Sequence, residues 1–105
     1  MANIECGDFM RSFQSGKNMY EITFYFSDDK YSKEHMIGYQ DKFEQEQPYW
    51  IGVCDVINGC EFSSAEELLN AKVFDGKSML DRWEKIIFLD INGITAAMWN
   101  ERFHL

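Results

Sequence analysis

The segment from Gln47 to Lys72 restricts the possible folds more than any other part of this 105-residue chain. Its first part, Tyr49 to Ile57, is rich in aromatic and β-branched residues, which is typical of a β-strand. The following pair, Asn58-Gly59, favours a tight hairpin turn because both residues tolerate a positive φ. Cys60 to Phe62 is then expected to form the short return strand, so the segment predicts a β-hairpin.

A helix is expected to begin directly after this hairpin. Ser63 and Ser64 each stand three residues before a glutamate, Glu66 and Glu67. That spacing is a capping box in either register, in which the serine hydroxyl accepts a hydrogen bond from an N–H group in the first turn. We therefore expect a helix over 64–72 that packs on the hairpin.

Three other segments have the pattern of strands. Apolar and polar residues alternate over Met19–Ser27, which predicts a half-buried antiparallel strand. After turn-forming residues at 27–30, Tyr31–Tyr39 is expected to return beside it. The segment 85–91 is apolar on both faces, as an interior strand requires. The polar stretch Gln40–Gln47 is expected to be an exposed loop.

Short helices are expected around these strands. Asp8 can cap a helix over 9–14, Ser78 can cap a short helix before 85–91, and Thr95 can cap a last helix over 96–103. The opening residues 3–6 could also form a strand. The whole predicts a small single domain of α+β class, with a mainly antiparallel sheet of about four or five strands and two to four short helices packed on it.

Charge is unevenly distributed along the chain, whose formal net charge is −8. Residues 19–72 contain eleven acidic residues against four lysines, whereas 73–105 contain five acidic residues against four basic ones. Direct binding of nucleic acid is disfavoured, because contacts with phosphate groups need Lys and Arg. A basic surface of a partner protein is favoured instead. The alternative is that the acidity serves solubility alone.

The chain contains three cysteines, Cys6, Cys54 and Cys60, which is an odd number. Their spacing matches no metal-binding motif. A tight turn at Asn58-Gly59 would place Ile57 opposite Cys60 and turn Cys54 to the other face of the sheet. Thiols on opposite faces cannot form a disulfide. We therefore expect free thiols in a reducing compartment.

Catalysis and metal binding have weak support in the sequence. A small enzyme or a metal-binding domain could use Cys54 or Cys60 together with His35, which remains an alternative. No pair of cysteines has the close spacing of a zinc site, and a reactive thiol needs a nearby base and exposure to solvent. We expect no catalytic residue, no metal and no cofactor.

Acidic residues and tyrosines form the candidate partner-binding site. Aromatic rings beside carboxylates are suited to contact with an arginine-rich protein surface. The acids lie on the strand at 19–27, in the turn after it and in the polar loop, and the tyrosines lie on the first two expected strands. The candidate partner-binding residues are Glu21, Tyr25, Asp28, Asp29, Tyr39, Glu44 and Glu46.

These features favour a non-catalytic protein-binding module, best described as a small acidic inhibitor that occupies a basic surface of a partner, for example one that normally holds nucleic acid. In size, acidity and domain number the chain is similar to phage-encoded inhibitors such as anti-CRISPR proteins and DNA mimics, although no motif carries that similarity. An immunity protein against a toxin is the alternative. The chain has no segment long and apolar enough to span a membrane and no signal peptide, so a cytoplasmic location is expected.

Overall fold

The computed structural model describes residues 4–15, 19–40, 46–57 and 59–103. Its centre is an antiparallel sheet with the strand order β4-β3-β2-β1-β5-β6. The strands are β1 (Ile22–Phe26), β2 (His35–Tyr39), β3 (Tyr49–Gly52), β4 (Cys60–Phe62), β5 (Ile86–Ile91) and β6 (Ile94–Thr95). The helices are α1 (Cys6–Ser15), α2 (Ala65–Asn70), the short 3-10 helix η1 (Trp83–Lys85) and α3 (Ala96–Phe103).

The α+β prediction is confirmed, with six strands in place of the expected four or five. The additional strand is β6, which is only two residues long. It arises because Asn92 and Gly93 both take a positive φ (54° and 84°) and reverse the chain directly onto β5. A positive φ at both central residues is the geometry of the tightest hairpin turn.

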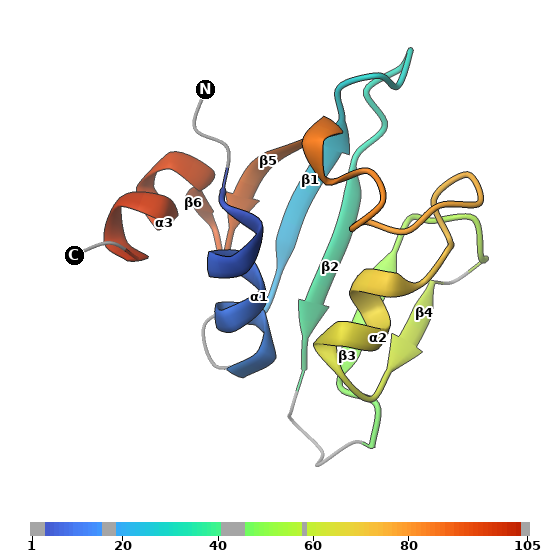
Figure 1. Ribbon diagram of the computed structural model, residues 1–105, viewed down its shortest axis with the longest axis horizontal. Helices are drawn as coiled ribbons and strands as arrows, with labels where there is room; N and C mark the ends of the chain where they lie inside the picture. Colours follow the sequence, from blue (N-terminus) through green and yellow to red (C-terminus); the bar gives the residue numbers. More distant parts are fainter. Residues whose placement is uncertain (1–3, 16–18, 41–45, 58, 104–105) are drawn as a thin grey trace.

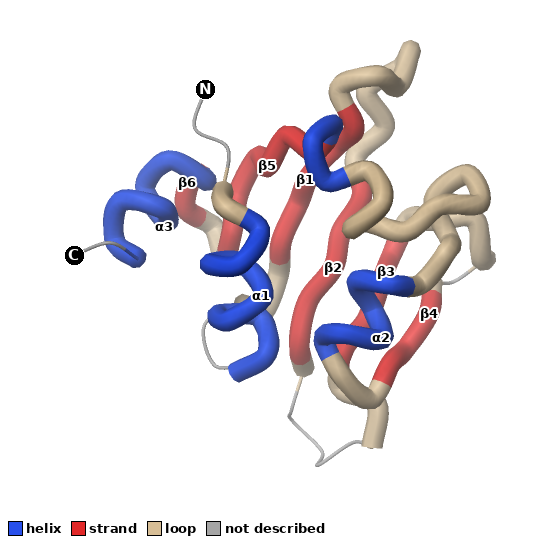
Figure 2. The backbone as a smooth tube through the Cα atoms, in the orientation of Figure 1, coloured by secondary structure: helices blue, strands red, loops and turns tan. Residues whose placement is uncertain are grey.

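Helices α1 and α2 cover the same face of the sheet, as Figures 1 and 2 show. Phe9 of α1 stacks on Phe88 of β5 with ring centroids 5.1 Å apart, and Phe13 meets Tyr49 of β3 edge to face at 5.0 Å. The predicted alternation in β1 follows from this layering: its first, third and fifth residues are fully buried beneath the helices. The intervening Tyr25 turns to the uncovered face of the sheet.

The β3–β4 hairpin forms, but its turn is not the predicted one. Strand β3 ends at Gly52 rather than at Ile57, and Ile51 rather than Ile57 is the residue opposite Cys60. The cause is local, because Val53 takes a left-handed conformation with φ at 53° and so breaks the strand. The connection is therefore a long loop, and the short return strand β4 has the predicted bounds. Asn58 itself lies outside the described residues.

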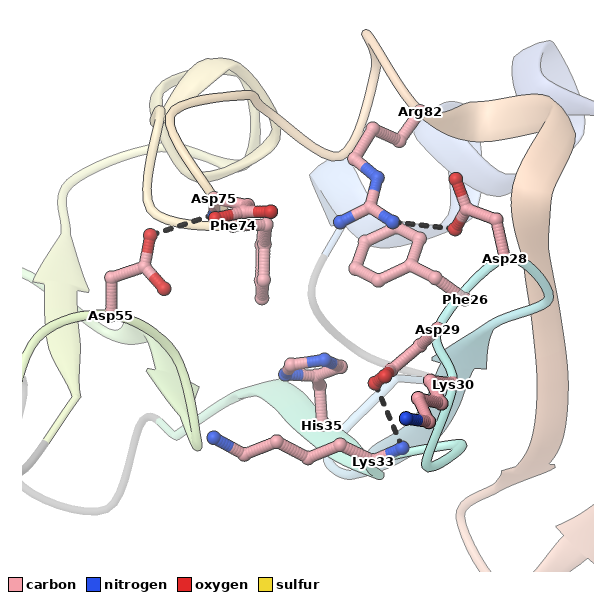
Figure 3. Close-up of a pocket in the computed structure, with 10 residues that line it drawn as sticks. All are labelled: Phe26, Asp28, Asp29, Lys30, Lys33, His35, Asp55, Phe74, Asp75 and Arg82. Carbon is pink, nitrogen blue, oxygen red and sulfur yellow. Dashed lines mark hydrogen bonds and ion pairs between the residues drawn. The ribbon is translucent and has the colours of Figure 1, made fainter.

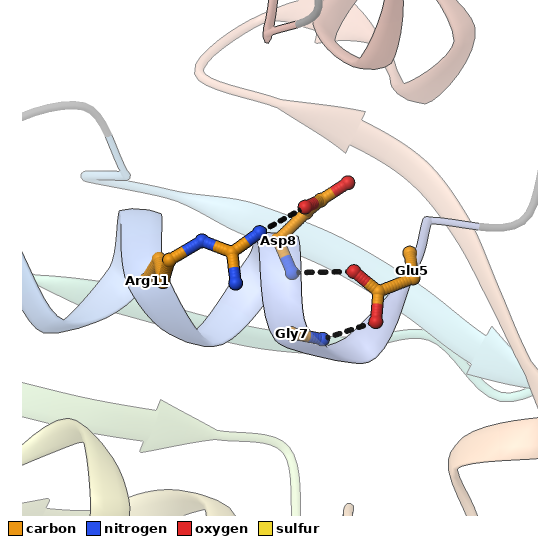
Figure 4. Close-up of polar contacts among 4 residues, drawn as sticks. All are labelled: Glu5, Gly7, Asp8 and Arg11. Atoms are coloured by element: carbon orange, nitrogen blue, oxygen red, sulfur yellow. Dashed lines mark hydrogen bonds and ion pairs between the residues drawn. The ribbon is translucent and has the colours of Figure 1, made fainter.

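The first helix begins earlier than expected and has a different cap. The two carboxylate oxygens of Glu5 accept hydrogen bonds from the backbone N–H groups of Gly7 (3.0 Å) and Asp8 (2.9 Å), as Figure 4 shows. These bonds lower the pKa of Glu5. Asp8 therefore lies inside the helix, where it pairs with Arg11. The alternative strand-like start is wrong, because Cys6 is already helical.

The predicted cap at Ser78 forms, although no α-helix follows it. The N–H of Asp81 donates to Ser78 Oγ (3.0 Å), and the N–H of Ser78 donates to Asp81 Oδ2 (3.1 Å). The predicted short helix is instead a pair of turns followed by η1, because β5 already begins at Ile86. The predicted cap of α3 is present, since Thr95 Oγ1 accepts from the N–H of Met98 (3.2 Å).

The predicted cap of α2 is confirmed and allows a stability test. Ser64 is the N-cap residue, and its Oγ accepts the N–H of Glu67 at 3.1 Å. We expect Ser64→Ala to lower the free energy of unfolding by about 1 kcal/mol, because the freed N–H group loses its partner. Ser63→Ala is the control, since the Ser63 hydroxyl bonds only to the exposed Glu67 carboxylate. Equal free energies of unfolding for the two variants in urea denaturation would contradict this role of Ser64.

Candidate functional site

The predicted partner-binding residues do not form a single patch. Tyr25 lies on the uncovered face of the sheet, whereas Tyr39 lies on the helix-covered face, where its ring meets that of Tyr49 at 5.0 Å. Glu21 lies directly before β1 and is exposed. Glu46 is exposed just before β3, and Glu44 lies outside the described residues. Tyr25 and Tyr39 therefore lie on opposite faces of the sheet and cannot belong to one binding patch.

Tyr49 is also unavailable to a partner. Only 6% of its surface is exposed, and its hydroxyl donates to the backbone carbonyls of Phe13 (2.9 Å) and Gln14 (3.0 Å) at the end of α1. Burial raises its pKa. Tyr49 therefore joins α1 to β3 and belongs to the core.

Asp28 and Asp29 are used within the protein. Asp28 pairs with Arg82 at 2.6 Å, and the Arg82 guanidinium lies over the ring of Phe26, 3.7 Å from its centroid. The Asp29 carboxylate accepts the backbone N–H groups of Tyr31 (3.1 Å) and Lys33 (3.0 Å), which lowers its pKa. Both aspartates therefore hold the loop between β1 and β2, and reversing their charges would disturb that loop.

A different part of the chain is acidic and contains no basic residue of its own. Residues 46–71 contain no Lys and no Arg. They form β3, β4, α2 and the loop between the strands, on the right of Figure 1. We call this unit the acidic edge. All five of its carboxylates are on exposed residues: Glu46, Asp55, Glu61, Glu66 and Glu67.

Exposed apolar side chains lie in the same unit. Residues 53–57, which we call the apolar loop, contain Val53, Val56 and Ile57 with 45%, 44% and 88% of their surfaces exposed. Isolated exposed apolar residues are ordinary, whereas exposed apolar side chains that are grouped together more often mark interaction sites. The sequence predicts a strand here because valine and isoleucine favour strands, and composition does not show whether their side chains are buried or exposed.

The apolar loop is held in place by bonds to two other segments. The N–H of Asp55 donates to the carbonyl of Val73 (2.9 Å), and Asp55 Oδ2 accepts the N–H of Asp75 (2.7 Å). The imidazole Nδ1 of His35 donates to the carbonyl of Val53. These bonds engage backbone groups of the loop and the side chain of Asp55, so the apolar side chains of the loop remain exposed. The loop is thus pre-organised, which lowers the entropy cost of binding.

A cleft of about 360 Å³ lies beside the loop, with His35 at its floor (Figure 3). Its rim contains four aspartates and three basic residues, so it is nearly balanced in charge. The imidazole packs among the rings of Phe24, Phe26 and Phe74, whose centroids are 5.4, 5.4 and 5.0 Å away. This burial lowers the pKa of His35, an effect that the Val53 carbonyl partly offsets.

The lowered pKa of His35 makes stability depend on pH. Above about pH 6.5 the imidazole is neutral in both states, and as the pH falls the unfolded chain takes up the proton first. We expect the free energy of unfolding to decrease from pH 6.5 towards pH 5, above the range in which depressed carboxylate pKa values matter. His35→Gln should abolish most of that slope in urea titrations. An unchanged slope would assign it to other groups, including His104.

The cysteines are not arranged as the sequence suggested. All three are free, as expected, but the argument from opposite faces does not apply, because Cys54 lies in the loop after β3 and not in the strand. The face argument assumed the tight turn, and the real register differs. Burial raises the pKa of Cys60, which is opposite to what a nucleophilic thiol needs. His35, the base of that alternative, uses Nδ1 for the Val53 carbonyl.

Within the described ranges, no group of three or more His, Cys, Asp or Glu residues is placed to hold a metal ion. No helix in that part of the chain has the length and apolarity needed to cross a membrane. Comparison with protein-family models, curated proteins and solved structures gave no match. The acidic edge with its apolar loop is therefore the candidate site, on the evidence of charge and exposure.

Proposed function

We propose that the protein is a non-catalytic binding module that inhibits a partner protein by covering a basic surface of it. One observation carries this proposal: Val56 and Ile57 are exposed within a unit that contains five exposed carboxylates and no basic residue. Among the predicted site residues, only Glu46 belongs to this unit. The other predicted residues are not part of the proposed site.

The two components of the site would act differently in binding. The carboxylates would attract Lys and Arg residues over several ångströms and so raise the rate of association. The apolar loop would supply a desolvated anchor of the kind that dominates interface energies. Both belong to the unit at the β4 edge of the sheet, and the proposal is that one partner surface contacts them together.

A surface that normally holds nucleic acid fits this description best, because such surfaces are rich in Lys and Arg. The protein would then compete with nucleic acid for its partner, as anti-CRISPR proteins and DNA mimics do. An immunity protein bound to a basic toxin would use the same contacts, and the identity of the partner separates the two. A cytoplasmic location belongs to the proposal, because free thiols persist in reducing compartments.

Site-specific cross-linking tests the proposal and identifies the partner. A photoreactive amino acid is placed at Ile57 or, as the control, at Met98 of α3, which is 45% exposed. Both variants are irradiated in lysate of the source organism. We expect a basic protein to cross-link at position 57 and not at position 98. The same captured proteins at both positions, or an acidic protein at position 57, would refute the proposal.

A further inference from the structure

Two cysteines flank Val56 and Ile57 of the apolar loop. Cys54 lies near the start of the loop and Cys60 is the first residue of β4, and the proximity of Cys54 contributes to the raised pKa of Cys60. Both residues are partly exposed, so a small oxidant can reach them. The third cysteine, Cys6, lies in the first turn of α1 and has no thiol partner among the described residues.

The carbonyl of Val56 holds both ends of the loop near one point. The carbonyl of Val56 accepts both the Cys54 thiol (3.7 Å) and the N–H of Gly59 (3.1 Å), the residue directly before Cys60. Cys60 is in turn fixed opposite Ile51 by the β3–β4 pairing. Both ends of the loop are thus anchored at one point, which removes most of the entropy cost of closing a ring.

We propose that Cys54 and Cys60 are a redox-active pair that forms a disulfide across the base of the apolar loop. The oxidant is a low-molecular-weight disulfide such as glutathione disulfide. One cysteine thiolate attacks that disulfide and releases one glutathione thiolate, leaving a mixed disulfide. The second cysteine thiolate then attacks the protein sulfur and releases the other glutathione. The two thiol protons pass to the glutathiones, so the protein loses two electrons and glutathione disulfide gains them.

The order of attack follows from burial. Because burial raises the pKa of Cys60, Cys54 is expected to attack first, and Cys60 then resolves the mixed disulfide. The product is a covalent ring that encloses Val56 and Ile57. Formation of this bond does not depend on the proposed function. The effect of the disulfide on binding does rest on the proposed function, because the ring would restrain the loop that contacts the partner.

Mass spectrometry in glutathione redox buffers tests the inference without any partner. In the native protein we expect loss of two hydrogen atoms and a Cys54–Cys60 linkage in the peptide map. We expect its equilibrium constant to exceed that of the urea-unfolded chain by at least about tenfold, or about 30 mV. The Cys54→Ser and Cys60→Ser variants should instead retain bound glutathione, and Cys6→Ser should behave like the unmodified protein.

Two outcomes would overturn the inference. One is a linkage that forms no better in the native protein than in the unfolded chain, which would mean that the fold does not favour it. The other is stable glutathione on both Cys54 and Cys60 of the same native molecule. Cross-linking at Ile57 can succeed or fail independently of either outcome, so the two proposals are tested separately.

Discussion

Replacing Val56 and Ile57 together by serine should weaken binding to the cross-linked partner on the order of 100-fold, which corresponds to about 3 kcal/mol. In the free protein these side chains are 44% and 88% exposed, so the substitution removes little packing. In a complex they would be buried against the partner, where a buried aliphatic side chain contributes about 1.5–3 kcal/mol. Isothermal titration calorimetry measures the loss, and urea denaturation should show unchanged stability within about 0.5 kcal/mol.

The matched control uses exposed apolar residues outside the acidic edge. Met98→Ser and Leu89→Ser change side chains that are 45% and 38% exposed on α3 and β5. Neither should change the affinity by more than about twofold. If these controls weaken binding as much as the loop variant does, the apolar loop is not the anchor.

Gly59→Ala should lower the free energy of unfolding by about 3 kcal/mol, the largest single-residue effect that we expect outside the core. A Cβ at this position would stand 1.8 Å from the backbone carbonyl oxygen of Ile51, closer than any real contact. The clash is with backbone in the β3–β4 pairing, so no side chain can move to relieve it. The left-handed φ of 77° adds a further penalty for alanine.

Gly76 provides a matched control for that prediction. It has the same φ of 77°, but a Cβ there would meet no atom within 4 Å. Gly76→Ala should therefore show only the conformational penalty of about 1 kcal/mol. Equal losses in the two variants would mean that the close approach to Ile51 can relax and that the hairpin tolerates a wider loop.

Local signals explain why much of the fold was predictable. Serine and threonine caps and the alternation over 19–27 each involve residues close in sequence, and each is present in the structure. The predicted cap at Asp8 was wrong for a related reason. Glu5 caps the helix three residues earlier, through the N–H groups of Gly7 and Asp8, and glutamate is not among the preferred cap residues.

The candidate site was less predictable because it depends on contacts between distant segments. The segment 53–57 has strand-like composition, and only the conformation of Val53 and the bonds to Val73 and His35 turn it into an exposed loop. Likewise, the sequence indicates only a surface charge at Asp28, because its partner Arg82 lies 54 residues later in the chain. The acidity of 19–72 was visible in the sequence, but the use of Asp28 and Asp29 within the β1–β2 loop was not.

The most direct test of the central claim compares two charge reversals with equal effects on net charge. Glu61→Lys/Glu66→Lys alters the acidic edge, whereas Glu84→Lys/Glu101→Lys alters exposed residues on η1 and α3. Affinity for the cross-linked partner is measured from 0.1 to 1 M salt, where the Debye length falls from about 10 Å to about 3 Å. We expect the first pair to lose at least about tenfold in affinity at low salt, with the difference shrinking as salt rises, and the second pair to lose little. Equal losses in both pairs, or affinities indifferent to salt, would contradict the assignment of binding to the acidic edge.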